Sequence, residues 1–231
     1  MDKSKLESVQ VQTLGKEAAD KIRNAIASGH FPAGARLLET ELSRELGLSR
    51  SPLREAFFLL EKEGLLVRHP RRGAFVRGLS RRETEEIYSL RTVLESLAVR
   101  RAVERMTPEA AAELRARLDR LHEAALAGDL EGFGRADVAW HECLIRVADH
   151  RLLQQTLFGL QTRVLQYMTE ASRSRPLVDI VRDHEELLAA LLSGDADRAE
   201  ASIKTHVLAS AARLLADLPE AIRDSEPSEV E

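Results

Sequence analysis

Four polar side chains in the second half of the 231-residue chain have the types and spacing of metal ligands. Asp137 and His141 are four residues apart, so they point from one face of a helix. His184 and His206 lie beside apolar residues on two later predicted helices. Burying three imidazoles and a carboxylate is costly, and a divalent cation removes that cost. The pattern suggests a metal site, although separate core or surface histidines would give the same spacing.

Helical periodicity covers the region that must position these four side chains. Apolar residues recur at helical spacing from Ser80 onward, and Pro, Gly and Asp residues interrupt the pattern. The expected helices are 80–105, 108–127, 129–148, 151–173, 177–192 and 195–217. We therefore expect an all-helical domain over 79–218, which contains the four candidate ligands. A disordered acidic tail over 219–231 would follow it.

The charge of the chain is divided unevenly between its two halves. Residues 1–78 contain 14 basic and 10 acidic side chains, a net of +4, and residues 79–231 contain 20 and 28, a net of −8. The first segment can approach a polyanion, whereas the second is repelled by one. No apolar run approaches the ~18 residues of a membrane span, and the polar first residues lack a secretory signal. With a single cysteine, Cys143, the composition favours a cytoplasmic protein without membrane contact.

The basic segment has the element order of a winged helix-turn-helix over 13–78, after a flexible tail over 1–12. Helices are expected over 14–28, over 39–46 and from 49–51 to Gly64, and short strands over 65–67 and 74–76 form a hairpin. Arg50 and Arg54 lie together near the start of the third helix, where arginines can contact guanine in the major groove. Arg71 and Arg72 lie at the hairpin tip. Each pair could also consist of ordinary solvated charges.

Longer motifs give this segment a resemblance to a known family. The runs Leu38–Ser43, Gly47–Ala56, Leu60–Leu65 and Arg72–Val76 resemble the DNA-binding domain of GntR-type bacterial transcription regulators. The resemblance implies base or phosphate contacts from the third helix and a minor-groove contact from Arg72 and Gly73. Thr40 stands where many relatives carry an arginine that touches DNA. The expected DNA-binding residues are Thr40, Ser49, Arg50, Ser51, Arg54, Arg71, Arg72 and Gly73.

The acidic half resembles the FCD effector domain of FadR-like GntR regulators. The resemblance is carried by Arg91-x-x-Leu94-Glu95, by Asp137-x-x-x-His141, by the run from His184 to Asp195, and by His206. It implies one divalent metal ion per chain, held by Asp137, His141, His184 and His206. Zinc suits these ligands, and nickel or manganese suits six-coordination. Arg91 is expected to bind an effector carboxylate, and the alternative is an intrahelical pair with Glu95.

The expected fold is mainly α, with an N-terminal winged helix-turn-helix followed by an all-α six-helix bundle of the FCD type. The expected function is that of a ligand-responsive transcription regulator, a repressor rather than an activator. It would bind a palindromic operator in double-stranded DNA as a homodimer, with its affinity set by a small carboxylate. One alternative is a regulator for which the metal itself is the signal. The other, a metal-dependent hydrolase, lacks a residue placed as general base, so we expect no enzyme.

Overall fold

The computed structural model describes residues 14–171 and 176–217. The tails expected over 1–12 and 219–231 lie outside the described residues. Internal contacts divide the chain into two compact units, one of Met1–Ile26 with Phe31–Arg77 and one of Ala27–His30 with Gly78–Glu231. The described part is mainly helical, with a winged helix-turn-helix followed by a helical bundle, which confirms the predicted fold class.

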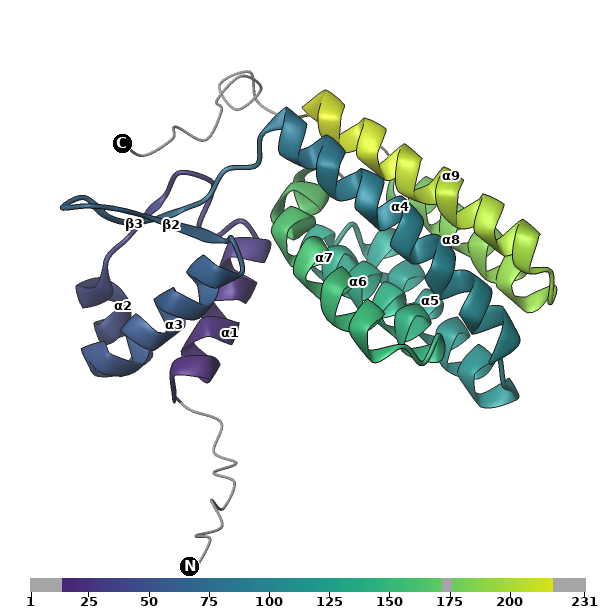
Figure 1. Ribbon diagram of the computed structural model, residues 1–231, viewed down its shortest axis with the longest axis horizontal. Helices are drawn as coiled ribbons and strands as arrows, with labels where there is room; N and C mark the ends of the chain where they lie inside the picture. Colours follow the sequence, from purple (N-terminus) through teal and green to yellow (C-terminus); the bar gives the residue numbers. More distant parts are fainter. Residues whose placement is uncertain (1–13, 172–175, 218–231) are drawn as a thin grey trace, which may run out of the picture. The chain divides into compact units, whose positions relative to one another are not determined.

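The first unit combines three helices with a small antiparallel sheet (Figure 1). Its elements are α1 (Leu14–Ala27), β1 (Arg36–Leu37), α2 (Glu39–Leu46), α3 (Arg50–Lys62), β2 (Leu66–His69) and β3 (Gly73–Val76). The sheet has the order β1-β3-β2, with Leu37 opposite Ala74 and Val67 opposite Phe75. The sequence predicts the β2–β3 hairpin but not β1, because two residues are too short to show an alternating pattern.

The turn between α2 and α3 depends on one glycine. Gly47 ends α2 in the left-handed conformation, with φ of 66°, which a residue without Cβ adopts at no steric cost. Ser49 then occupies the N-cap position of α3 in extended conformation. Along α3, Leu53, Ala56, Phe57 and Leu60 are buried in the core of this unit, as their helical spacing predicts. The opposite face of α3 is left exposed.

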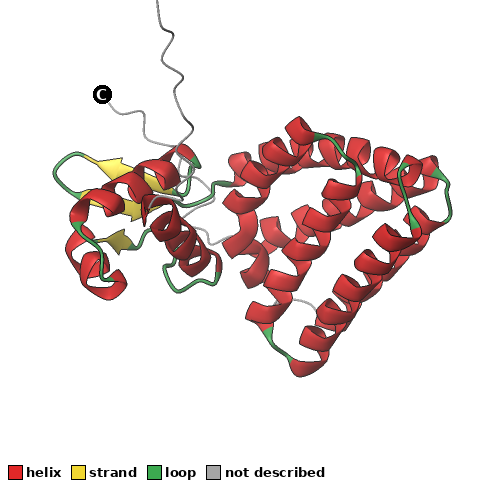
Figure 2. Ribbon diagram, turned by 90° about the horizontal axis from the view of Figure 1, so that it is seen from below, coloured by secondary structure: helices red, strands yellow, loops and turns green. Residues whose placement is uncertain are grey.

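The described residues of the second unit form a bundle of six helices (Figure 2). They are α4 (Arg81–Glu104), α5 (Pro108–Ala127), α6 (Leu130–Val147), α7 (Arg151–Ala171), α8 (Leu177–Leu192) and α9 (Ala196–Asp217). Side chains at the N-caps fix three of the starts: Ser80, Thr107 and Asp129 each accept a hydrogen bond from the backbone N–H three residues later. Within the described residues, the expected helix bounds agree with the structure to within about one residue. The end expected at 173 lies outside the described residues.

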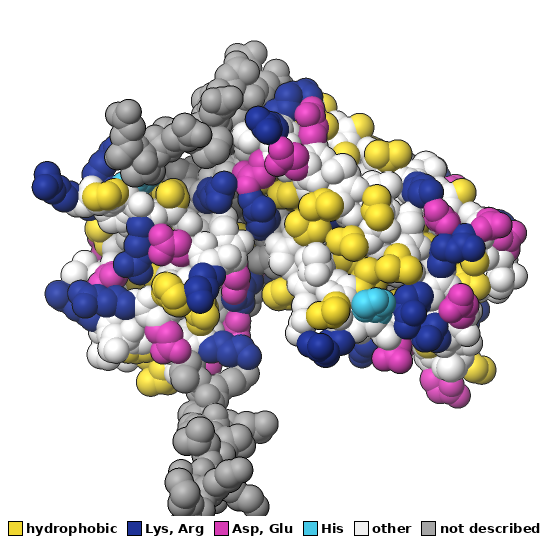
Figure 3. Space-filling view, in the orientation of Figure 1, with side chains coloured by type: hydrophobic (Ala, Val, Ile, Leu, Met, Phe, Trp, Pro, Cys, Tyr) yellow, Lys and Arg dark blue, Asp and Glu magenta, His cyan; other side chains and the backbone are white. Residues whose placement is uncertain are grey.

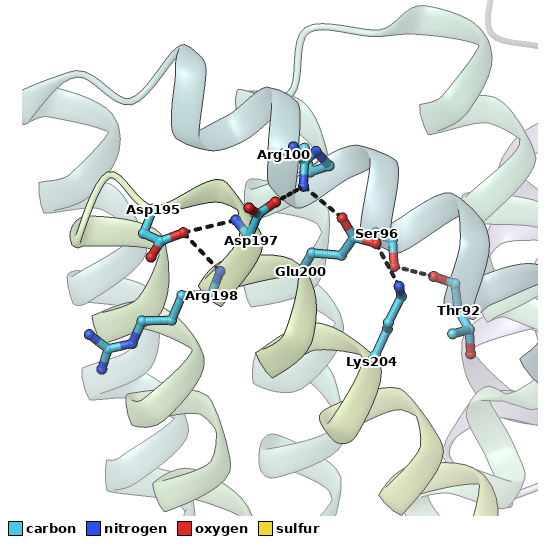
Figure 4. A network of polar contacts seen from close by, with 8 residues as sticks. All are labelled: Thr92, Ser96, Arg100, Asp195, Asp197, Arg198, Glu200 and Lys204. Carbon is cyan, nitrogen blue, oxygen red and sulfur yellow. Dashed lines mark hydrogen bonds and ion pairs between the residues drawn. The ribbon is translucent and has the colours of Figure 1, made fainter.

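Helix α4 packs along α9 and also contacts α6, while α8 packs against α5 and α9. Polar contacts reinforce the α4–α9 pair at the surface, where Arg100 lies 2.6 Å from an oxygen of Asp197 and 2.8 Å from one of Glu200 (Figure 4). This packing directs one face each of α6, α8 and α9 into the interior of the bundle. Within the described residues, no helix is long and apolar enough to cross a membrane.

Candidate functional site

Helices α6, α8 and α9 bring three histidines together inside the bundle. One ring nitrogen each of His141, His184 and His206 lies within 4.8 Å of the other two, and all three side chains are buried. The ring centroids are 5.3 Å apart for His141 and His184, 5.1 Å for His141 and His206, and 4.6 Å for His184 and His206. Asp137, one turn before His141, is buried beside them and places Oδ1 3.0 Å from His184 Nε2. The three predicted histidines therefore share one interior site, and Asp137 borders it through its contact with His184.

The contacts of His184 determine what can occupy this site. Its Nδ1 lies 2.8 Å from the carbonyl oxygen of Ile180, one turn earlier. Because a carbonyl oxygen only accepts, Nδ1 carries a proton, and in the neutral ring Nε2 presents a lone pair. That lone pair faces the Asp137 carboxylate, which also only accepts when ionised. Two acceptors 3.0 Å apart require a proton or a cation between them.

A second contact has the same character. His206 Nε2 and His141 Nε2 lie 3.2 Å apart, so a hydrogen bond between them needs a proton on one of the two. The other ring nitrogens of these two residues, His141 Nδ1 and His206 Nδ1, are buried and have no hydrogen-bond partner among the described residues. Buried polar groups without partners are costly and uncommon in folded proteins. Three imidazoles and one carboxylate form the donor set that Zn²⁺ and related divalent ions prefer, so the residues fit such an ion.

Burial and the neighbouring charges set the protonation of the cluster. Burial lowers the pKa of His141 and outweighs the attraction of Asp137 and Glu95 for its protonated form. Burial, followed by the nearby His184 and His141, holds the pKa of His206 well below its ordinary value. Burial alone would raise the pKa of Asp137, but the adjacent His184 holds it well below the usual range. Neutral imidazoles and an ionised carboxylate are the forms that bind a metal.

Two large side chains form the wall of the cluster. Trp140 is fully buried, with its ring 5.2 Å from that of His141 and 5.0 Å from that of His184 in edge-to-face geometry. Glu95 of α4 is buried on another side, with Oε2 3.7 Å from His141 Nδ1. The sequence marks Glu95 only as a partner of Arg91, because its separation from His141 along the chain gives no signal of proximity.

Arg91, the predicted effector ligand, is buried in the bundle with its guanidinium on Glu95. Arg91 Nε donates to Glu95 Oε1 at 2.8 Å, so the intrahelical pair that the sequence leaves open is present. Burial works to lower the pKa of Arg91, but the charge of Glu95 raises it further above its usual value. The guanidinium also lies 4.7 Å from the ring centre of Tyr88, whose hydroxyl is 3.1 Å from Ser210 Oγ. A role for Arg91 in binding an effector stays a prediction.

The predicted DNA-binding residues all lie on the surface of the first unit. Ser49, Arg50, Ser51 and Arg54 are exposed around the start of α3, and Arg54 Nε lies 3.2 Å from Glu39 Oε2. Ser49 makes no side-chain capping bond, so its hydroxyl does not satisfy the N–H groups of the first turn of α3. Such N–H groups and hydroxyls can bind phosphate. The remaining predicted residues, Thr40 on α2 and Arg71, Arg72 and Gly73 at the wing, are also exposed.

The tip of the wing has a strained backbone that projects its arginines. Arg71 has φ of 63° and Gly73 has φ of 98°, and the backbone N–H of Arg72 bonds to the carbonyl of His69 at 3.1 Å. A non-glycine residue in the left-handed region is uncommon and is associated with functional turns. The tight turn leaves both arginine side chains in solvent, which is the placement needed for contact with a groove or phosphate.

A winged helix-turn-helix joined to a helical bundle with an interior polar cluster defines a class of DNA-binding regulators. Comparison with protein-family models assigns both parts: residues 14–76 match the model described as bacterial regulatory proteins of the gntR family, and residues 86–209 match the FCD domain. The chain belongs to the GntR family of bacterial regulatory proteins, in the group that carries an FCD domain. It is a transcription regulator rather than an enzyme.

Curated relatives and solved structures agree with this assignment. The chain is 32% identical to a probable D-xylose utilization operon transcriptional repressor of Paenarthrobacter nicotinovorans, over 85% of this chain and 87% of that one. It is 30% identical to the transcriptional repressor RspR of Escherichia coli, over 85% of this chain and 86% of the relative. The solved structure of E. coli McbR/YncC superposes with a TM-score of 0.81 at 25% identity, covering 88% of this chain and 98% of that one.

Proposed function

We propose that this protein is a transcriptional repressor that binds a palindromic operator as a homodimer and responds to a small organic acid. We further propose that the acid binds at a divalent metal ion held by Asp137, His141, His184 and His206. The proposed metal site rests on one observation above all. Two acceptor atoms, His184 Nε2 and Asp137 Oδ1, lie only 3.0 Å apart in the bundle interior. Repression is supported by the two relatives that are named as repressors.

Operator binding is supported by the exposed residues of the first unit. Arg50 and Arg54 are exposed at the start of α3, and we propose that they contact base edges or phosphates in a major groove. Arg71 and Arg72, exposed at the wing, would contact the neighbouring groove. Thr40 offers a hydroxyl where a longer basic side chain would reach further, so α2 contributes less. An operator-binding role also places the protein with the DNA in the bacterial cytoplasm.

The metal would supply a Lewis-acidic centre that accepts a carboxylate when bound. Asp137 would neutralise part of its charge, and the three imidazoles would bind through their lone pairs. Zinc suits this donor set, and nickel or manganese would suit a site with more oxygen ligands. Arg91 is the nearby cation that could contact an effector carboxylate, and to do so it would have to share or exchange its contact with Glu95. This exchange would link effector binding to the interior of the bundle.

Dimerisation is supported by an apolar face on the helical unit. Leu90, Val93 and Leu97 of α4 are 53%, 68% and 43% exposed and follow the i, i+3, i+7 spacing of a helix-packing stripe. Helix α7 packs beside α4 and adds exposed Leu152 and Phe158, and hydrophobic side chains gather on this side of the unit (Figure 3). A twofold axis would bring the same stripe of two chains together, so a second copy of the chain is the partner we propose for it.

Light scattering after gel filtration tests the dimer. Val93→Glu should convert the protein to a monomer, because it places a charge in the middle of the proposed interface. Leu126→Glu is the matched control, since Leu126 is 73% exposed at the end of α5, away from this face. Two variants with the same dimeric mass would contradict the assignment of the α4–α7 face.

The complete function is tested by selection of operator sequences from random duplex DNA with the purified protein. A palindromic consensus is expected, and titration of small carboxylic acids into the metal-loaded complex should weaken operator binding. If added metal alone changes operator affinity and no acid does, the metal is itself the signal. If the selected sequences show no twofold symmetry, the proposed mode of binding is wrong.

A further inference from the structure

His141 and His184 are held in the cluster by different partners. His184 donates its Nδ1 proton to the carbonyl of Ile180 within its own helix. His141 has no such carbonyl bond among the described residues, and its Nδ1 instead faces Oε2 of Glu95 at 3.7 Å. Both of these atoms are buried, and neither has a hydrogen-bond partner in the part of the chain that the structure describes. His141 Nδ1 and Glu95 Oε2 are therefore the nearest available partners for each other.

The chemistry of an imidazole ligand determines which ring nitrogen of His141 must carry the proton. The atom that His141 presents to the cluster is Nε2, which lies 3.2 Å from His206 Nε2. To bind a metal, Nε2 must carry a lone pair, so the single ring proton must reside on Nδ1. A carboxylate that accepts this proton fixes the tautomer, aims the ring and makes Nε2 a stronger donor. Glu95 is the carboxylate in that position.

Arg91 explains how a carboxylate can be kept there. Glu95 is 2% exposed, and an ionised group at that depth needs a partner of opposite charge. Arg91 Nε donates to Oε1 at 2.8 Å, on the oxygen that does not face His141. The other oxygen, Oε2, is thereby directed toward the ring. Arg91 thus holds a carboxylate of α4 with one oxygen 3.7 Å from His141 Nδ1 of α6.

We propose that Glu95 is a positioning residue that accepts the Nδ1 proton of His141 and so directs Nε2 toward the metal, with Arg91 holding Glu95 in place. The proposal rests on the proposed metal site for its consequence, but its structural core, the tautomer of His141, exists without any metal. It adds to the four ligands a fifth and a sixth residue, Glu95 and Arg91, on which metal affinity depends.

Two variants separate this role from a general effect on folding. Glu95→Gln keeps the shape of the side chain but removes the charge. Because the guanidinium of Arg91 only donates, the single amide oxygen stays on Arg91 and the amide NH2 faces His141 Nδ1. The double variant Arg91→Met/Glu95→Leu removes both charged groups together, so neither is left buried without its partner. Circular dichroism and thermal melting of both variants establish that they fold before any affinity is compared.

The first measurement is the ¹⁵N chemical shifts of the His141 ring in the metal-free, full-length protein. We expect the wild-type ring to be protonated on Nδ1 and the rings of both variants to shift toward protonation on Nε2. A wild-type ring protonated on Nε2, or a double variant with an unchanged tautomer, overturns the proposal. If the double variant does not fold, the zinc affinity of Glu95→Gln tests the proposal in its place.

The second measurement is Zn²⁺ affinity by competition with a chromophoric chelator. Loss of such an outer partner lowers metal affinity by about 10–100-fold, which is the change expected for the double variant. Glu95→Gln should lose at least as much, because its amide NH2 disfavours a proton on His141 Nδ1. Affinities equal to wild type in both variants overturn the role of Glu95. A wild-type protein that binds no Zn²⁺ would instead count against the proposed metal site. The tautomer of the His141 ring would still test whether Glu95 accepts the Nδ1 proton.

Discussion

Replacement of Asp137 by asparagine separates the metal site from ordinary core packing. The two side chains have nearly the same shape, so the packing around α6 is conserved. In the metal-free protein the introduced amide would donate to the lone pair of His184 Nε2, which now lies 3.0 Å from the Asp137 carboxylate. One neutral hydrogen bond is worth about 1 kcal/mol net, so the free energy of unfolding without metal should change by no more than about that amount.

The metal-loaded protein should respond very differently to the same substitution. A ligand present at about 1,000 times its Kd stabilises the folded state by about 4 kcal/mol, and a site weakened about 1,000-fold retains only about 0.4 kcal/mol at the same concentration. For a domain of this size, the full increment corresponds to a Tm increase of about 8–16 °C. Asparagine lacks the negative charge of a ligand, so most of this increase should be lost.

The assay is thermal unfolding of both proteins after chelator treatment and again after addition of Zn²⁺, Ni²⁺ or Mn²⁺. Glu142→Gln is the matched control, because it removes a carboxylate from the same helix at an exposed position next to His141. The control should keep the full metal-dependent increase. Equal increases in the wild type and Asp137→Asn, or no increase in the wild type with any of the three ions, would refute the reasoning.

Three further predictions address DNA binding, pH and the core. Arg50→Ala should weaken operator binding by about 1–3 kcal/mol and relax sequence preference. Fluorescence anisotropy measures this loss, with Arg44→Ala on α2 as the control. Equal losses in the two variants would contradict a base contact by Arg50. Because burial lowers the pKa of His141 and His206, the unfolded chain binds more protons below about pH 6.5, and the metal-free protein should lose up to about 1.4 kcal/mol per pH unit for each histidine as pH falls. Urea unfolding that is independent of pH below about 6.5 would argue against two buried neutral imidazoles. Phe57→Ala should lower the stability of the first unit by about 3–5 kcal/mol, and a loss under about 1 kcal/mol would be inconsistent with its burial in that core.

Helix positions could be predicted from the sequence because strong local signals mark them. Gly47 and Gly128 end helices in the left-handed conformation, and Ser80 and Thr107 accept N-terminal capping bonds, so each boundary is set by nearby residues. Strand β1 could not be predicted in this way. Its two residues gain their conformation from pairing with β3, which lies far along the chain, with Arg36 opposite Phe75.

The four candidate ligands could be named from their types and from the family pattern, but not placed by periodicity alone. Asp137 and His141 share a helix face by spacing, whereas the approach of His184 and His206 depends on how α8 and α9 pack. The environment of Arg91 illustrates the same limit. Its pair with Glu95 is local and visible as an i, i+4 spacing, but the approach of Glu95 to His141 arises only from the packing of α4 on α6.

X-ray absorption spectroscopy of the purified protein, after equilibration with zinc, tests the central claim most directly. We expect one ion per chain with a first shell of nitrogen and oxygen at about 2.0–2.1 Å and the multiple-scattering signature of three imidazoles. The imidazole signature should weaken when His206 is replaced by alanine. A shell that contains sulfur at about 2.3 Å, an ion surrounded by oxygen alone, or a protein that retains no zinc would contradict it.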